Sequence, residues 1–182
     1  MRKWNAIISA GILILFLVHG VAGAFQMVGV FPGGSAVLKW ISWVMMGLMT
    51  LHTLIGAKLT RDTILACRKS GASYFKDNKL FWARRISGLA IFVLIFFHVA
   101  LFMGRNTGVY RLNYFGGAQL VLQILLVLSI AVHVITNVNP LLIAFGMKKV
   151  KEYAVDILIV LSVLLMFAGL AFFVYYIRWS RI

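Results

Sequence analysis

Residues 84–104 read RRISGLAIFVLIFFHVALFMG, and from Ile86 onward only Ser87 and His98 interrupt the run of apolar residues and glycines. As an α-helix rising about 1.5 Å per residue, this stretch crosses the roughly 30 Å hydrocarbon core of a bilayer. An ionisable side chain inside such a span costs a few kcal/mol on insertion scales, so it is seldom there without a role. The stretch therefore predicts a membrane-spanning helix that contains a functional histidine.

Four other stretches have a similar length and apolar character. Of the 182 residues, 63% are hydrophobic and only 12% are charged, a balance that soluble domains do not have. The first apolar run continues past the signal-peptide-like Ala22–Ala24, so we interpret it as a retained span rather than a cleaved leader. We expect one all-α membrane domain, residues 1–182, built as a bundle of five transmembrane helices. The expected spans are roughly 5–28, 37–58, 84–104, 117–145 and 154–177.

The positive charges predict the topology. The net charge is +14, and most Lys and Arg residues occur at alternate ends of the spans. They are Arg2 and Lys3, eight residues between Lys58 and Arg85, and Lys148, Lys149 and Lys151. The positive-inside rule then places the N-terminus in the cytoplasm and the C-terminus outside. We expect the membrane to be the bacterial cytoplasmic (inner) membrane. A basic inner face suits anionic lipid or an acidic partner protein, and this distribution argues against nucleic-acid binding.

Each of the first four spans contains one histidine, and the chain has no other: His19, His52, His98 and His133. Counted at about 1.5 Å per residue from the outer end of each span, His98 lies about 10 Å deep and His19 about 15 Å deep. On the same scale His52 lies about 20 Å deep and His133 about 24 Å deep. The depths predict that His19 pairs with His98 near the outside. His52 then pairs with His133 near the cytoplasm.

Two histidines that face each other at one depth form a bis-imidazole site, and neutral imidazole is a good axial ligand of haem iron. We therefore expect two haem b groups. His19 and His98 would bind the distal iron, and His52 and His133 the proximal iron. The chain has no C-x-x-C-H motif, so both haems would be held non-covalently. Two other interpretations stay open: one haem with structural histidines, or a histidine-lined path for protons or metal ions.

Haem propionates need charged partners at the membrane edge, and both edges supply candidates. Those at the inner edge are Lys58, Arg61, Arg84 and Arg85, and those at the outer edge are Lys39, Arg105 and Arg111. Small residues near the histidines would let a flat ring approach the helix backbone. These are Gly20, Gly23, Gly56 and Gly88.

The two halves of the chain resemble each other. Ile8-Ser9 precedes His19 much as Ile86-Ser87 precedes His98. The next histidine follows after 33 residues in the first half and after 35 in the second. This spacing suggests two copies of one helical hairpin, each giving one ligand to each haem.

With these features the chain resembles the dihaem cytochrome b membrane anchor of succinate dehydrogenases and fumarate reductases. That family has five spans, with ligating histidines on the first four and none on the fifth. The most specific local feature is Arg84-Arg85-Ile86-Ser87-Gly88 leading into His98. It is similar to an Arg-x-Ser/Thr-Gly helix start in cytochromes of that superfamily, where the arginine and hydroxyl groups lie by the quinone or the haem propionates. The resemblance implies cofactor contacts for Arg84, Arg85 and Ser87, in addition to the outer candidates Lys39 and Arg105.

The resemblance also implies partners and a function. The family pairs the ligands of its first helix with the third and of its second with the fourth. The proximal haem faces a cytoplasmic iron–sulfur subunit, which is bound to an FAD-containing flavoprotein that holds the dicarboxylate site. Electrons pass between these proteins and a membrane quinone, expected to be menaquinone, linking the tricarboxylic acid cycle to the respiratory chain. This chain has no cysteine cluster and no Gly-rich nucleotide motif, so it would be the electron-transfer and quinone-reacting part of the enzyme.

The sequence identifies no catalytic residue, but it offers candidate quinone contacts at both edges. They are Gln26, Lys39, Trp40, Trp43, Asn106 and Tyr110 outside, and Trp82, Arg84, Ser87 and Asn137 inside. The outer half carries no carboxylate, so a glutamate-based proton path across the membrane is not expected. Two alternative functions remain for the chain: a cytochrome b anchor for another quinone-linked oxidoreductase, and a histidine-lined transporter.

Overall fold

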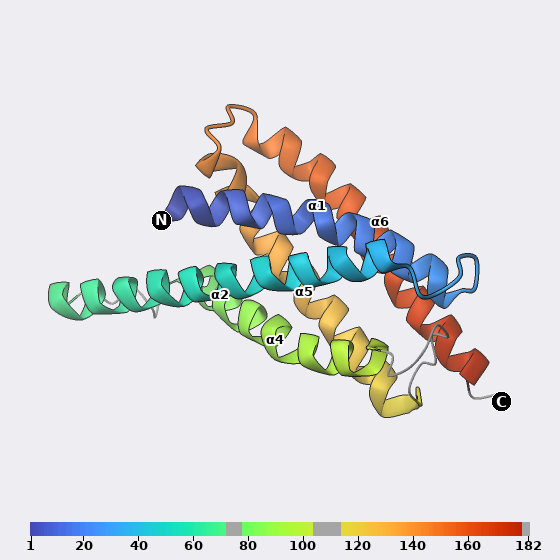
Figure 1. Cartoon of the computed structure of the whole chain (residues 1–182). Helices are drawn as coiled ribbons and strands as arrows, with labels where there is room; N and C mark the ends of the chain where they lie inside the picture. The colour runs from blue at the N-terminus through green and yellow to red at the C-terminus, as the bar shows by residue number, and fades with distance from the viewer. Residues whose placement is uncertain (72–77, 104–113, 180–182) are drawn as a thin grey trace.

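The computed structural model describes residues 1–71, 78–103 and 114–179, and this part of the chain is helical with no strand (Figure 1). All five helices are long and apolar enough to cross a membrane, which confirms the predicted all-α, five-span architecture. The helices are α1 (Arg2–Met27), α2 (Ala36–Ser70), α4 (Lys79–Phe102), α5 (Gly117–Ala144) and α6 (Val150–Trp179).

Several helices are longer than the apolar stretches that predicted them. The clearest case is α2, which continues past Lys58 to Ser70 because a helix needs only backbone hydrogen bonds and no breaker intervenes. It ends at Gly71, whose φ of 67° is the left-handed conformation that glycine adopts at a helix C-terminus. The start of α4 is fixed by Asn78, whose side chain accepts a hydrogen bond from the Phe81 N–H at 3.0 Å.

The bundle consists of two hairpins joined by the last helix. α1 packs on α2, α4 packs on α5, and α6 contacts both α1 and α5. Its Leu161, Leu165 and Ala171 are buried, so the core follows α6. Among the described residues, α2 makes no extensive contact with α4 or α5. The two hairpins are therefore held together along one side and are separated along the other.

The basic segments lie at one end of the bundle. Figure 1 shows the N-terminus, the last turns of α2 and the turn between α5 and α6 at that end, with the C-terminus at the opposite end. We call the end of the bundle that holds the N-terminus and the basic segments the basic end, and the opposite end the far end. The basic segments, which alternate with the apolar spans along the sequence, thus gather at one end of the folded bundle.

Candidate functional site

A cavity of about 1940 Å³ lies between the two hairpins and is lined by residues of all five helices. Pockets for a single small molecule usually measure about 300–1,000 Å³, so this cavity has room for two large ligands. Its walls are mostly apolar, and all four histidines line it. Cations line its ends: Arg2, Lys3, Arg61, Arg68, Arg84 and Arg85 at the basic end, and Lys39 at the far end.

The four histidines form two close pairs inside the cavity. The ring centroids of His19 and His98 are 6.0 Å apart, and those of His52 and His133 are 6.1 Å apart. These are the two pairs that the depths along the spans predict. Two imidazoles that bind one metal ion from opposite sides, each at about 2 Å, keep their ring centres roughly 6 Å apart. The spacing within each pair therefore suits a shared metal ion.

Every histidine ring is held by a side chain from a neighbouring helix, always at Nδ1. The partner of His98 is the Gln123 Oε1 atom at 2.8 Å. The other three partners are serine Oγ atoms: Ser42 on His19 at 3.0 Å, Ser9 on His52 at 3.1 Å, and Ser87 on His133 at 3.2 Å. Three of these partners, Ser9, Ser42 and Gln123, were not among the predicted site residues.

The hydrogen bonds at Nδ1 indicate which nitrogen of each ring carries the proton. A hydroxyl group has one proton. Ser9, Ser42 and Ser87 each donate theirs to a carbonyl oxygen four residues back in their own helix, at 2.7, 2.8 and 2.6 Å. Their oxygen atoms can then accept from Nδ1–H of the histidine. The Gln123 carbonyl oxygen can only accept, so we assign the proton of all four rings to Nδ1.

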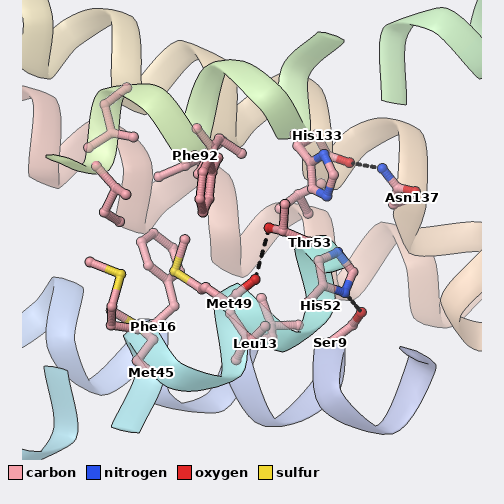
Figure 2. Close-up of a pocket in the computed structure, with 18 of the residues that line it drawn as sticks. Ser9, Leu13, Phe16, Met45, Met49, His52, Thr53, Phe92, His133 and Asn137 are labelled. Carbon is pink, nitrogen blue, oxygen red and sulfur yellow. Dashed lines mark hydrogen bonds between the residues drawn. The ribbon is translucent and has the colours of Figure 1, made fainter. Parts of the chain in front are cut away.

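This tautomer leaves Nε2 of each ring with its lone pair, which is the state that binds a metal. Histidines that bind metals typically donate the other ring N–H to a neighbouring acceptor, which fixes their orientation. Figure 2 shows the arrangement for the basic-end pair. One ring nitrogen of His52 contacts Ser9, and the nitrogen on the other side of the ring points toward His133.

The histidine partners follow the internal repeat. In each hairpin a serine on the first helix holds the histidine of the second helix: Ser9 in one, Ser87 in the other. A polar residue on the second helix holds the histidine of the first: Ser42 in one, Gln123 in the other. Ser42 precedes His52, and Gln123 precedes His133, by the same ten residues. That spacing was the signal that could have found these residues from the sequence.

The predicted small residues have different surroundings. A Cβ atom at Gly88 would lie 3.2 Å from Cε1 of His133, so the glycine lets α4 approach the ring closely. Gly23 and Gly56 line the cavity and have no atom within 4 Å of an added Cβ. Gly20 also lines the cavity, but a Cβ there would contact α6. Gly23 and Gly56 thus leave space for a ligand beside the helix backbone.

Arg84 and Ser87, both predicted as cofactor contacts, fasten α4 to α5 around His133. The Arg84 Nε–H donates to the carbonyl oxygen of Thr136 at 2.8 Å. That carbonyl is four residues before Pro140, which has no N–H to complete the helical hydrogen bond. Arg84 thereby replaces the donor that Pro140 lacks. It also lines the cavity, whereas Ser87 contributes through His133.

Within the described residues, only some of the other predicted haem and quinone contacts line the cavity. Arg85 lines the cavity at the basic end, with its guanidinium carbon 4.9 Å from the centroid of the Phe81 ring. Lys39 lines the far end. Arg105, together with Asn106, Tyr110 and Arg111, lies outside the described residues. Of the remaining quinone candidates, Gln26, Trp43 and Asn137 line the cavity, and Trp40 and Trp82 are exposed side chains that do not.

An apolar layer separates the two histidine pairs. Phe16 of α1, Met45 and Met49 of α2, and Phe92 of α4 line the cavity beside the basic-end pair (Figure 2). Along each helix they lie between the residues that form the two pairs and their hydrogen-bond partners. In the described part of the chain, no three His, Cys, Asp or Glu side chains gather at one place. Each candidate site therefore offers two imidazoles and an apolar surrounding. Comparisons with protein-family models, curated proteins and solved structures gave no match to this chain.

Proposed function

We propose that this chain is a dihaem cytochrome b that anchors a succinate:quinone oxidoreductase in the membrane. In this proposal His19 and His98 bind one haem, and His52 and His133 bind the other. The observation that carries it is the pair geometry: ring centroids 6.0 and 6.1 Å apart, with Nδ1 of all four rings engaged on a neighbouring helix.

The residues of the cavity fit a haem at each pair. Two neutral imidazoles with free Nε2 lone pairs at each pair would hold the iron of a haem. The walls are apolar, and Gly23 and Gly56 leave open space beside the backbone. Arginines at the basic end and Lys39 at the far end supply cations for propionates. A bound haem supplies a one-electron carrier, and the chain's own side chains bind and orient it.

The apolar layer favours this function over a histidine-lined transporter. A path for protons or metal ions needs polar groups or water in continuous succession. Phe16, Met49 and Phe92 line the cavity and lie, along their helices, between the levels of the two histidine pairs. Two histidine sites with an apolar layer between them suit electron transfer, because electrons need no polar path.

The proposed partners are those that the family resemblance implies, and the charge distribution supports their side of the membrane. We place the basic end, and with it the N-terminus, in the cytoplasm of a bacterial cell by the positive-inside rule. The basic-end pair then faces an iron–sulfur subunit, which in turn binds an FAD-containing flavoprotein. Electrons pass through both sites between those proteins and a membrane quinone, with menaquinone as the expected type. What supports a cytoplasmic partner in this chain is the basic end itself. There α2 continues beyond the apolar region, and this part of the helix carries the exposed side chains of Arg61 and Arg68.

The test is a haem count on the purified full-length protein, with a reduced-minus-oxidised optical spectrum. We expect two b-type haems per chain. His52→Ala and His133→Ala should remove the same haem, and His19→Ala and His98→Ala the other. A protein that folds and carries no b-type haem would contradict the proposal. Loss of the same haem from His19→Ala and His52→Ala would contradict the pairing.

A further inference from the structure

One of the four histidine partners differs from the others. Three histidines donate to a serine hydroxyl, and His98 donates to the amide oxygen of Gln123. This hydrogen bond is also the shortest of the four, at 2.8 Å against 3.0 to 3.2 Å. In the internal repeat the equivalent of Gln123 is Ser42, so the fold uses serine for the same purpose elsewhere. The difference therefore calls for a specific explanation.

The surroundings strengthen the Gln123 hydrogen bond. Its side chain has an exposed fraction of 0%, so no solvent competes for the bond. A hydrogen bond in a region of low dielectric constant is electrostatically stronger than one in water. Gln123 also carries a cost, because its Nε2 atom is buried and has no partner within the described structure. A residue that leaves an amide group unsatisfied at a fully buried position is better explained by what its oxygen does than by packing.

We propose that Gln123 is a positioning residue that increases the electron donation of His98 and so lowers the reduction potential of the far-end site. The inference rests on the proposed haem function. An acceptor on Nδ1–H makes a ligating imidazole more basic, and hydrogen bonds to the axial ligands are a recognised means of setting haem potentials. A more basic imidazole stabilises the oxidised iron, which lowers the potential. The strongest acceptor of the four thus acts on the far-end site alone.

The experiment compares Gln123→Met with Gln123→Glu. Methionine has a similar length and no strong acceptor, whereas glutamate offers a stronger acceptor than glutamine. Both are made in the full-length chain and in the His52→Ala background, which isolates the far-end site. Redox titration followed optically gives the midpoint potential of each haem, and the haem count shows whether both sites are filled. Gln119→Met is the matched control, since Gln119 lies on the same helix and accepts from the Gly116 N–H.

We expect opposite shifts from the two variants. Gln123→Met should raise the far-end potential, changing the reduction equilibrium about tenfold, or about 59 mV for one electron. Gln123→Glu should lower it, and the other potential should stay unchanged in both. With the haems bound, shifts of the same sign, equal shifts at both sites or no shift would overturn the inference. Loss of the far-end haem from both variants would overturn it as well, because Gln123 would then have a packing role. A wild-type protein without haem would instead refute the proposed function.

Discussion

The Nε–H of Arg84 donates to the carbonyl oxygen of Thr136 at 2.8 Å, and this carbonyl is the one that Pro140 leaves without a helical donor. The contact joins α4 to α5 three residues from His133. It lets α5 continue through a proline to Ala144 without leaving an unpaired carbonyl in an apolar environment. The arginine of the Arg84–Gly88 motif therefore has a structural role in addition to any role at the cofactor.

This relationship predicts a non-additive pair of substitutions. Arg84→Met removes the donor to Thr136 and should destabilise the protein by about 1–3 kcal/mol. Pro140→Ala restores a backbone N–H in α5, so Arg84→Met should cost less in that background. Denaturation of the four proteins of this double-mutant cycle in detergent measures the coupling. Arg68→Met, an exposed arginine at the same end, serves as the control. Equal costs in both backgrounds would show that the Thr136 carbonyl does not need Arg84.

The serine partners predict an effect on haem affinity. Ser42→Ala removes the acceptor of His19 Nδ1–H and frees the ring to rotate, and changes of this kind typically cost 10–100-fold in metal affinity. We expect a loss of about that size at the far-end site alone, measured as haem content during titration of the apoprotein. Ser162→Ala is the matched control, because Ser162 donates to a carbonyl of its own helix and is exposed. An unchanged affinity in Ser42→Ala would mean that helix packing alone orients His19.

Two glycines of similar helical setting give a sharper comparison. Gly88→Ala places a Cβ atom 3.2 Å from His133 Cε1, so the ring or the helix must move. At Gly47 an added Cβ has no atom within 4 Å. We expect Gly88→Ala to disturb the basic-end site and to change its optical spectrum or haem occupancy. Gly47→Ala should leave both sites intact and add about 0.5–1 kcal/mol of helix stability. Indistinguishable spectra of the two variants would show that the ring tolerates the closer contact.

Much of the fold could be predicted because membrane helices are governed by length and hydropathy. The five helices follow from the apolar stretches. Counting residues from the span ends was also enough to group His19 with His98, since depth depends only on helical rise. The predicted end of the second helix, near Lys58, came too early. An apolar run ends where the membrane ends, whereas a helix continues until a breaker such as Gly71 occurs.

The histidine partners were harder to predict because they depend on how the helices face each other. A serine in a membrane helix usually donates to its own backbone, and nothing in the sequence alone shows where its lone pairs point. The shared ten-residue spacing from the next histidine marks Ser42 and Gln123 as equivalent positions. The rings that they hold, those of His19 and His98, depend on the crossing of α1 with α2 and of α4 with α5. Pro140 similarly shows, from the sequence, that the Thr136 carbonyl lacks its helical donor. That Arg84 is the donor could be known only from the packing of α4 on α5.

The orientation of the imidazole rings predicts an EPR signature. The ring planes of His19 and His98 make an angle of 69°, and those of His52 and His133 an angle of 87°. Parallel axial imidazoles split the iron d orbitals and give a rhombic low-spin signal, whereas near-perpendicular rings keep two of those orbitals close in energy. We therefore expect strongly anisotropic low-spin signals from both oxidised sites, the more anisotropic from the basic-end pair. Low-temperature EPR of the wild type, His19→Ala and His52→Ala assigns each signal to its site. A rhombic signal from either site would show that its rings turn toward parallel when the haem binds.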